Sequence, residues 1–123
     1  MWEIQRTDEI AEWIKLLDGD ARTAILKNLI ILKEIGPNLG RPYVDTVKLS
    51  RHQNMKELRV QNKMRVFRIF FMFDMDRNAI LLIGGDKRGD KRFYEKMIPV
   101  ADVLFDKYIM LRRKRNENNK EEK

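Results

Sequence analysis

The first third of the chain carries apolar residues at helical spacing. Residues 2–6 alternate between apolar and polar and predict a short opening strand. Thr7 is the expected N-cap of a helix, because acidic residues follow it in the first turn and apolar residues then recur every three or four positions. A second apolar stripe, which ends at Gly36-Pro37, predicts another helix; its members are Ile25, Leu29, Leu32 and Ile35. Together these elements predict a helical hairpin.

Beyond residue 46 the helical spacing gives way to the alternation that is typical of β-strands. Residues 38–46 are expected to form a loop because they are rich in Gly, Pro and Asn. Three segments rich in β-branched and aromatic side chains then predict strands at residues 56–60, 65–73 and 79–83. Short turns separate these segments, so we expect an antiparallel meander. Within the first of them, Glu57 and Arg59 should share one face of the sheet, and Leu58 and Val60 the other.

The remainder of the chain predicts one helix and a tail. Asp90 can cap a final helix whose apolar residues continue to residue 111, and Pro99 inside it predicts a kink or a restart. From Arg112 onward no apolar residue occurs, so residues 112–123 are expected to be a basic, frayed tail after a domain of residues 1–111. The resulting order, β-α-α-β-β-β-α with the helices segregated from the sheet, is that of an α+β domain.

The residue types that are scarce exclude several kinds of chemistry. The 123 residues fit one domain, and 43% apolar residues are enough for a core. Cysteine is absent and His52 is the sole histidine, which excludes disulfides, thiol nucleophiles and Cys-based zinc sites and disfavours a Ser-His-Asp triad. His52 itself has no partner at a useful spacing. The pattern shows neither a signal peptide nor a membrane-length apolar run, so we expect a cytoplasmic protein without membrane contacts.

Basic residues exceed acidic ones, and the excess is unevenly distributed. The chain has 26 Lys and Arg against 19 Asp and Glu, a net charge of +7. Residues 1–36 carry five basic and seven acidic residues, whereas residues 48–92 carry twelve and five. The segment from Lys107 onward carries seven and three. This concentration predicts a polyanionic partner, either nucleic acid or an acidic protein. A protein whose basic surface serves only solubility is the simpler alternative.

Two arginines fall on strands that we expect to pair. Arg59 follows Glu57 on one strand, and Arg68 interrupts an otherwise apolar run on the next. An arginine in such a place needs a carboxylate, a phosphate or an aromatic face. One interpretation is an ion pair with Glu57 or Asp74, and the other is a bidentate clamp on a phosphate.

A second cluster surrounds the start of the final helix, at residues 86–94. Glycine permits close backbone approach and a helix N-terminus attracts anions. Four basic residues crowd this turn: Lys87, Arg88, Lys91 and Arg92. Tyr94 lies one helical turn beyond Asp90 and can share their surface, although it can equally be a core aromatic beside solvated charges. The basic residues 112–115 of the tail either serve solubility or add attraction to RNA.

Three stretches together resemble the phage-derived, HigB-type branch of the RelE/ParE toxin superfamily. They are residues 55–60 (MKELRV), residues 65–71 (RVFRIFF) and residues 84–99 (GGDKRGDKRFYEKMIP). The last stretch is the most specific of the three. The opening strand and first helix also fit, so the likeness covers roughly residues 1–110.

The resemblance implies both a fold and an activity. The fold is a compact RelE-like domain in which an antiparallel sheet is flanked by an N-terminal helical hairpin and a C-terminal helix. The activity is that of a type II toxin: a ribosome-dependent endoribonuclease that cuts mRNA in the A site, blocks translation and arrests growth. Neither a metal nor another cofactor is implied, because the 2′-OH attacks the neighbouring phosphorus and leaves a cyclic phosphate. This chemistry requires cations for the phosphorane charge and acid or base groups at the 2′ and 5′ oxygens.

The resemblance also implies roles for individual residues. Arg59 and Arg68 match the strand arginines of the family, Arg88 matches the arginine after the last strand, and Tyr94 matches the C-terminal tyrosine. Arg68 is then expected to stabilise the transition state. Tyr94 is expected to act as acid or base or to stack on a base, and a base role would need cationic neighbours such as Arg88 and Lys91. The flanking cations are expected to bind RNA: Lys56, Arg65, Lys87, Lys91 and Arg92.

The chain departs from the RelE pattern at one point. RelE-type enzymes carry lysines on the strand before the first arginine, where this chain has Met55 and Glu57, with Lys56 directed to the other face. Glu57 is therefore a candidate general base, unless the catalytic arrangement differs from that of RelE.

Two further functions remain open from the sequence. One is a ParE-like inhibitor of DNA gyrase without nuclease activity, and the other is a non-enzymatic nucleic-acid-binding module or toxin relic. Both toxin functions imply a cognate antitoxin, expected to be a helix-turn-helix protein of HigA type that also contacts operator DNA. The nuclease has the ribosome and mRNA as additional partners. An acidic antitoxin segment that covers the basic face would explain part of the charge.

Overall fold

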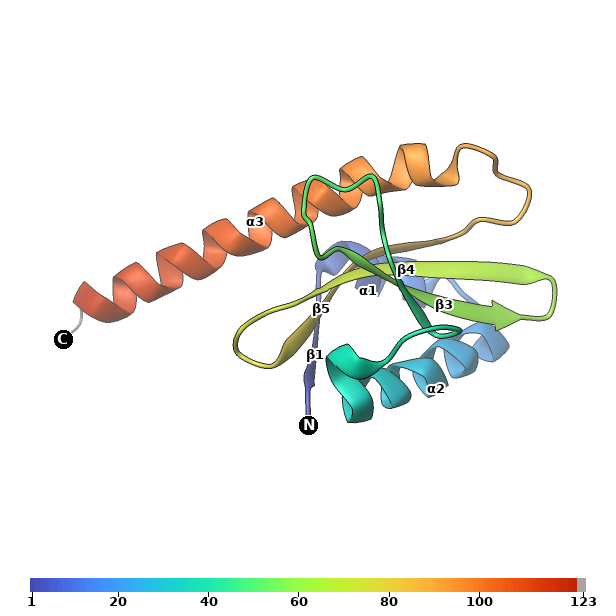
Figure 1. Cartoon of the computed structure of the whole chain (residues 1–123), viewed down its shortest axis with the longest axis horizontal. Helices are drawn as coiled ribbons and strands as arrows, with labels where there is room; N and C mark the ends of the chain where they lie inside the picture. Colours follow the sequence, from blue (N-terminus) through green and yellow to red (C-terminus); the bar gives the residue numbers. More distant parts are fainter. Residues whose placement is uncertain (122–123) are drawn as a thin grey trace.

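The computed structural model describes residues 1–121 as a five-stranded sheet between two layers of helices (Figure 1). The strands are β1 (Glu3–Arg6), β2 (Val44–Thr46), β3 (Lys56–Asn62), β4 (Arg65–Phe73) and β5 (Asn78–Asp86). The helices are α1 (Asp8–Lys15), α2 (Gly19–Ile35), the short 3-10 helix η1 (Gly36–Asn38) and α3 (Phe93–Glu121). Helices α1 and α2 cover one face of the sheet and α3 crosses the other. The predicted α+β class, with its helical hairpin and C-terminal helix, is confirmed.

The strand order β1-β5-β4-β3-β2 corrects the sequence prediction in two places. Strands β3, β4 and β5 form the expected antiparallel meander, but β1 pairs with β5 in parallel, with Ile4 opposite Ala79. Periodicity predicts a strand without predicting its partner, so the parallel edge was missed. Residues 38–46, expected to be a loop, contain β2, in which Val44 pairs with Leu58. Three residues are too short for alternation to be visible in the sequence.

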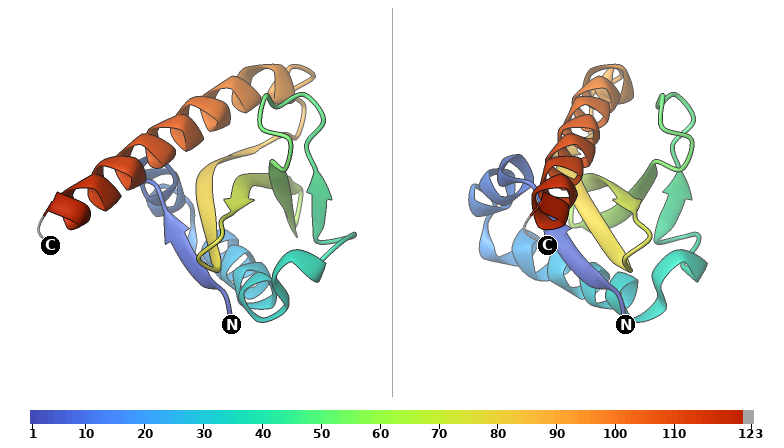
Figure 2. Two further views of the ribbon diagram at one scale, coloured as in Figure 1. Left: turned by 60° about the vertical axis from the view of Figure 1, so that its left-hand side comes forward. Right: turned by 90° about the vertical axis from the view of Figure 1, so that its left-hand side faces the viewer.

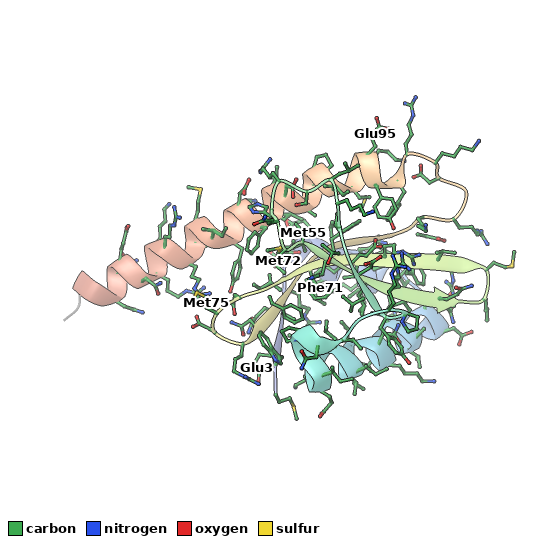
Figure 3. The ribbon with its side chains drawn as sticks, viewed as in Figure 1. Glu3, Met55, Phe71, Met72, Met75 and Glu95 are labelled. Carbon is green, nitrogen blue, oxygen red and sulfur yellow. The ribbon has the colours of Figure 1, made fainter. Side chains whose placement is uncertain are left out.

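Strand β4 is buried on both faces and separates two apolar clusters. Phe67 and Phe71 pack with residues of α1 and α2, whereas Phe70 and Met72 pack with residues of α3. This division confirms the two faces predicted from the alternation of residues 65–73. Figure 3 shows Met55 and Met72 between the sheet and α3, with Phe71 nearer α2. The two faces of the sheet therefore carry separate apolar clusters, and β4 contributes side chains to both.

Side-chain caps fix where α1 and α2 begin. Thr7 accepts a hydrogen bond from the Ile10 amide at 3.1 Å, which confirms the predicted N-cap, and Asp18 accepts one from the Ala21 amide at 2.9 Å. Asp18 also binds the guanidinium of Arg65 on β4, with Nη1 to Oδ2 at 2.7 Å. The hydrogen bonds from Arg65 and the Ala21 amide lower the pKa of Asp18 from 3.8 to about 2. Asp18 therefore joins the helical hairpin to the sheet through a charge-assisted contact.

The ion pair of Asp18 makes a prediction for stability in acid. Asp18→Asn keeps an acceptor for the cap but removes the charge. Because the folded-state pKa of Asp18 lies below its ordinary value, the stabilisation is present above the ordinary pKa and is lost as the pH falls through about 2. We expect the variant to melt below wild type at about pH 5, with a difference that shrinks toward about pH 2. Calorimetry at both pH values checks this, and an unchanged difference at the lower pH would contradict it.

Helix α3 is longer and more regular than the sequence predicts. It passes through Pro99 without a break, because Pro99 lies on the solvent-exposed side, where the carbonyl that it leaves unpaired can meet water. Residues 112–121 are helical, so the expectation of a frayed tail is wrong for them; residues 122–123 lie outside the described part. Arg112 contacts Asp74 at 2.9 Å and also Asp76, which anchors this turn, and Arg, Lys and Glu beyond it favour helix. Figure 2 shows the end of α3 projecting past the sheet.

None of the described helices is both long and apolar enough to cross a bilayer.

Candidate active site

Three charged residues of the sheet meet a tyrosine of α3 on the sheet face that α3 covers. Glu57 of β3 is only 4% exposed. The Tyr94 hydroxyl donates a hydrogen bond to Glu57 Oε2 at 2.8 Å. Arg59 Nε lies 3.4 Å from Glu57 Oε1, and Arg68 Nε lies 3.8 Å from Glu57 Oε2. We refer to Glu57, Arg59, Arg68 and Tyr94 as the Glu57 network. It unites four of the five residues for which the sequence predicted a catalytic role.

The register of β3 and β4 explains why a carboxylate belongs here. Arg59 stands directly opposite Arg68 in the antiparallel pair, and like charges in that relation destabilise a sheet. Glu57 precedes Arg59 by two residues, so it shares the same face and places its carboxylate between the two guanidinium groups. The interpretation of these arginines as ion-paired with Glu57 is confirmed. Asp74, the other carboxylate considered for them, binds Arg112 instead.

Arg68 is a buried arginine with an unused donor. It is 9% exposed, and its Nη1 donates to the Phe67 carbonyl at 3.0 Å. Its Nε has no hydrogen-bond partner among the described residues, since 3.8 Å from the Glu57 carboxylate is too long for an N–H···O bond. A buried donor without a partner costs about 1–3 kcal/mol. An anion that approaches more closely than Glu57 would recover this cost.

Arg59 lies at the rim of the network. Its side chain is 33% exposed, and its Nη2 is 3.7 Å from Asp45 of β2. Asp45 is itself held by Arg41 at 2.7 Å. Arg59 is therefore shared between one buried and one accessible carboxylate, and it can turn toward an incoming ligand. Asp45 was missed in the sequence because its segment was expected to be a loop, and no pattern there indicates a partner for Arg59.

The surroundings of Tyr94 determine its protonation state. Burial raises the pKa of Tyr94 above its ordinary value of 10, and the hydrogen bond to the Glu57 carboxylate raises this pKa further. Arg68 opposes both effects, but the direction remains upward. The phenol is therefore protonated at neutral pH. Of the roles expected for Tyr94, the structure favours proton donation over proton abstraction.

Lys87 lies over the ring of Tyr94, with its Nζ 5.5 Å from the ring centroid. Arg88 was expected beside Tyr94, yet its guanidinium donates to the Met64 carbonyl at 3.4 Å, at the turn between β3 and β4. Lys91 and Arg92 are exposed in the turn that precedes α3. The loop thus presents Lys87 to the network and keeps three basic residues, Arg88 included, on the surface around it.

Two other cations predicted to bind RNA are engaged elsewhere. Arg65 binds Asp18, and its guanidinium lies 5.5 Å from the centroid of the Phe67 ring, on the side of α1 and α2. Lys56 donates to Thr46 Oγ1 of the edge strand at 2.8 Å. The alternation of the strands placed Lys56 correctly on the face opposite Glu57. Neither residue joins the Glu57 network.

A surface cavity of about 530 Å³ lies elsewhere, between the start of α1 and the second half of α3. Thr7, Tyr108 and Leu111 contribute to its lining, and no member of the Glu57 network does. Within residues 1–121, no group of three or more His, Cys, Asp and Glu side chains is arranged to hold a metal ion. The candidate active site is therefore the network itself, a charged layer between sheet and helix.

Comparison with known proteins places the chain in a family. The sequence profile of the family described as "Phage derived protein Gp49-like (DUF891)" matches residues 12–106. The chain belongs to this family. Two related proteins of Mycobacterium tuberculosis are named as HigB toxins. HigB3 is 45% identical over 102 residues, which cover 82% of this chain and 88% of HigB3. HigB2 is 40% identical over 104 residues, which cover 83% of this chain and 52% of HigB2.

The fold of this HigB-type chain is also found among solved structures. The isolated RelE toxin of E. coli superposes with a TM-score of 0.51 at 10% sequence identity, over 79% of this chain and 96% of RelE. At such an identity the likeness concerns the fold alone. The resemblance to HigB-type toxins is confirmed, and the predicted RelE-like fold is confirmed with it.

In this HigB-type chain, a loop that precedes β3 is fastened to α3 by two aspartates one helical turn apart. Asp102 accepts hydrogen bonds from the Ser50 hydroxyl and, at 3.3 Å, from the Arg51 amide. Asp106 binds the Arg51 guanidinium and His52 Nε2, the latter at 2.8 Å. The sequence offered no partner for His52. The structure shows that its partner is Asp106, which lies 54 positions further along the chain. The loop leads directly into Glu57, so these contacts hold the two segments that carry Glu57 and Tyr94 together (Figure 2).

Proposed function

We propose that this chain is the toxin of a type II toxin–antitoxin system and acts as a ribosome-dependent endoribonuclease that cleaves mRNA in the A site. The observation that carries the proposal is the Glu57 network, which brings two arginines, a carboxylate and a protonated phenol within a few ångströms. The names of HigB3 and HigB2 support the toxin part of the proposal.

The network offers one group for each requirement of metal-independent RNA cleavage. Glu57 takes the proton of the 2′-OH, whose oxygen then forms a bond to the neighbouring phosphorus. Arg68 and Arg59 stabilise the negative charge of the phosphorane. Tyr94 gives its proton to the 5′ oxygen as the bond from phosphorus to that oxygen breaks. The products are a 2′,3′-cyclic phosphate and a free 5′-OH.

The raised pKa of Tyr94 yields a prediction on acid catalysis. Tyr94→Phe removes the donated proton and should lower the cleavage rate about 10²–10⁴-fold. Because the active form is the protonated phenol and its pKa is raised above 10, the wild-type rate should show no loss from Tyr94 between about pH 7 and pH 9. Single-turnover cleavage on ribosomes that carry a defined mRNA measures both effects. A wild-type rate that declines across this range, with the decline abolished in Tyr94→Phe, would contradict the assignment.

The proposed partners follow from the same activity and from the charge of the chain. A net charge of +7 suits an acidic antitoxin segment as well as RNA. The antitoxin is proposed to be a helix-turn-helix protein of HigA type that also binds operator DNA, and the toxin itself contacts the ribosome and mRNA. Co-purification with the product of an adjacent small reading frame would support this part of the proposal.

One experiment tests the activity directly. The protein is induced in cells, and the 5′ ends of all mRNAs are mapped. New ends inside translated frames, absent from a matched transcript whose start codon has been removed, would support a ribosome-dependent nuclease. Intact mRNA together with accumulating complexes of gyrase and cleaved DNA would overturn it in favour of a ParE-like inhibitor.

A further inference from the structure

The carboxylate of Glu57 lies among the hydrogen-bond donors of the network. It accepts the Tyr94 hydroxyl at 2.8 Å and lies 3.4 Å and 3.8 Å from the Nε atoms of Arg59 and Arg68. The side chains of Glu57 and Arg68 are 5% and 11% exposed, so little of either is open to solvent. The free protein thus holds a carboxylate of its own among two guanidinium groups and a phenol.

We infer that Glu57 is an internal occupant of this site and that the scissile phosphate binds by displacing its carboxylate from Arg59 and Arg68. The identification of the ligand as an RNA phosphate rests on the proposed function. The site itself follows from the donors: a phosphate presents more acceptor oxygens than a carboxylate and can engage both guanidinium groups. The carboxylate serves as a placeholder until RNA arrives.

The contacts that Glu57 makes with the arginines are loose. A charge-assisted N–H···O bond is ordinarily about 2.7–2.9 Å long, and both Nε distances exceed this range. The chain provides its own comparison, because Arg65 holds Asp18 at 2.7 Å through Nη1 and at 3.1 Å through Nη2. Arg68 has no such pairing, and its Nε is unpartnered among the described residues. A phosphate that satisfies this donor gains what Glu57 leaves unused.

The displacement also links binding to chemistry. The carboxylate that leaves the arginines stays on β3 beside the bound nucleotide, where it can take the 2′-OH proton. The Tyr94 hydroxyl loses its acceptor at the same moment and can turn toward the phosphate oxygens. One movement of Glu57 therefore opens the phosphate site and presents both the base and the acid.

The test measures binding separately from cleavage. The probe is a single-stranded RNA oligonucleotide with 2′-O-methyl groups, which cannot cyclise, and its affinity for the purified full chain is measured by fluorescence anisotropy at low salt. Glu57→Gln retains an acceptor for Tyr94 but removes the competing charge. We expect it to bind the probe about tenfold more tightly, the effect of removing one like charge beside an anion, while cleavage of natural mRNA falls.

A matched control separates the local effect from the general one. Glu34 is an exposed residue of α2, the helix on the other face of the sheet. Glu34→Gln removes the same charge outside the network, so its affinity for the probe should stay within about twofold of wild type. Equal tightening in both variants, unchanged or weaker binding by Glu57→Gln, or no binding by either protein would overturn the inference.

A second measurement applies even if Glu57→Gln does not fold. In wild-type protein labelled with ¹³C at the glutamate carboxylates, the Glu57 signal should shift when the probe is added. A stationary signal at saturation would overturn the inference. Failure of the ribonuclease proposal shows itself separately, as intact mRNA in cells, because the probe used here cannot be cleaved.

Discussion

Arg68→Ala is expected to lower mRNA cleavage about 10²–10³-fold, the range seen when one donor to a developing oxyanion is removed. Arg68 is the innermost cation of the Glu57 network, and its Nε is free to bind the phosphorane. Arg59 remains in the variant but lies at the rim, shared with Asp45. The measurement is the yield of new mRNA 5′ ends after induction, together with the growth of the induced cells.

Two companion variants make this result interpretable. Arg68→Lys keeps the positive charge but loses the planar guanidinium group. We therefore expect its cleavage yield to lie between the yields of wild type and Arg68→Ala. Arg22→Ala removes an exposed arginine of α2 on the opposite side of the sheet and should cleave like wild type. Loss of Arg68 removes one of the positive charges beside the buried Glu57 carboxylate, which lowers stability. The melting temperature of each variant must therefore be measured. Full cleavage by a folded Arg68→Ala protein would remove Arg68 from the mechanism.

Phe70→Ala and Phe71→Ala are expected to lose similar stability and to differ in function. Both side chains are fully buried, so each substitution should lower the free energy of unfolding by about 3–5 kcal/mol. Phe70 lies under α3, with its ring centroid 6.1 Å from that of Tyr94. Phe71 faces the other layer and contacts Phe73 at 5.2 Å. Only Phe70→Ala should therefore expose the side chain of Tyr94 to more solvent.

The two phenylalanine variants are distinguished by the titration of tyrosine. Burial is the largest cause of the raised pKa of Tyr94, so in Phe70→Ala this pKa should fall toward 10, whereas in Phe71→Ala it should stay raised. Urea unfolding gives the stabilities, and ultraviolet absorbance of the phenolate gives the pKa. If both variants shift the titration equally, the sheet does not separate two independent layers.

Local alternation was sufficient to predict the strands that build the candidate site. Side chains alternate between the two faces of residues 65–73. This alternation predicted one face for Phe67 and Phe71 and the other for Arg68 and Phe70, and the structure has the same two faces. The same argument placed Glu57 and Arg59 on one face. These predictions succeed because the direction of a side chain in a strand depends on its neighbours in sequence alone.

The contacts that assemble the site lie beyond local pattern. Glu57 and Tyr94 are 37 positions apart, and their hydrogen bond depends on how α3 crosses the sheet. His52 and Asp106 are 54 positions apart for the same reason. Arg88 was named as a cationic neighbour that a base role of Tyr94 would need, but its guanidinium is directed to the β3–β4 hairpin. Spacing limits how far apart two residues lie without determining the direction of either side chain.

The parallel pairing of β1 with β5 affects how the protein is made. Residue 3 pairs with residue 78, so the first strand to leave the ribosome waits for the last one. Closing so long a loop carries an entropic cost and makes such non-local pairing slow. The β2–β4 segment can begin to assemble earlier, but Tyr94 follows β5 in the chain. A chain that stops before residue 94 lacks the phenol of the site, so the Glu57 network can form only after the start of α3 has been made.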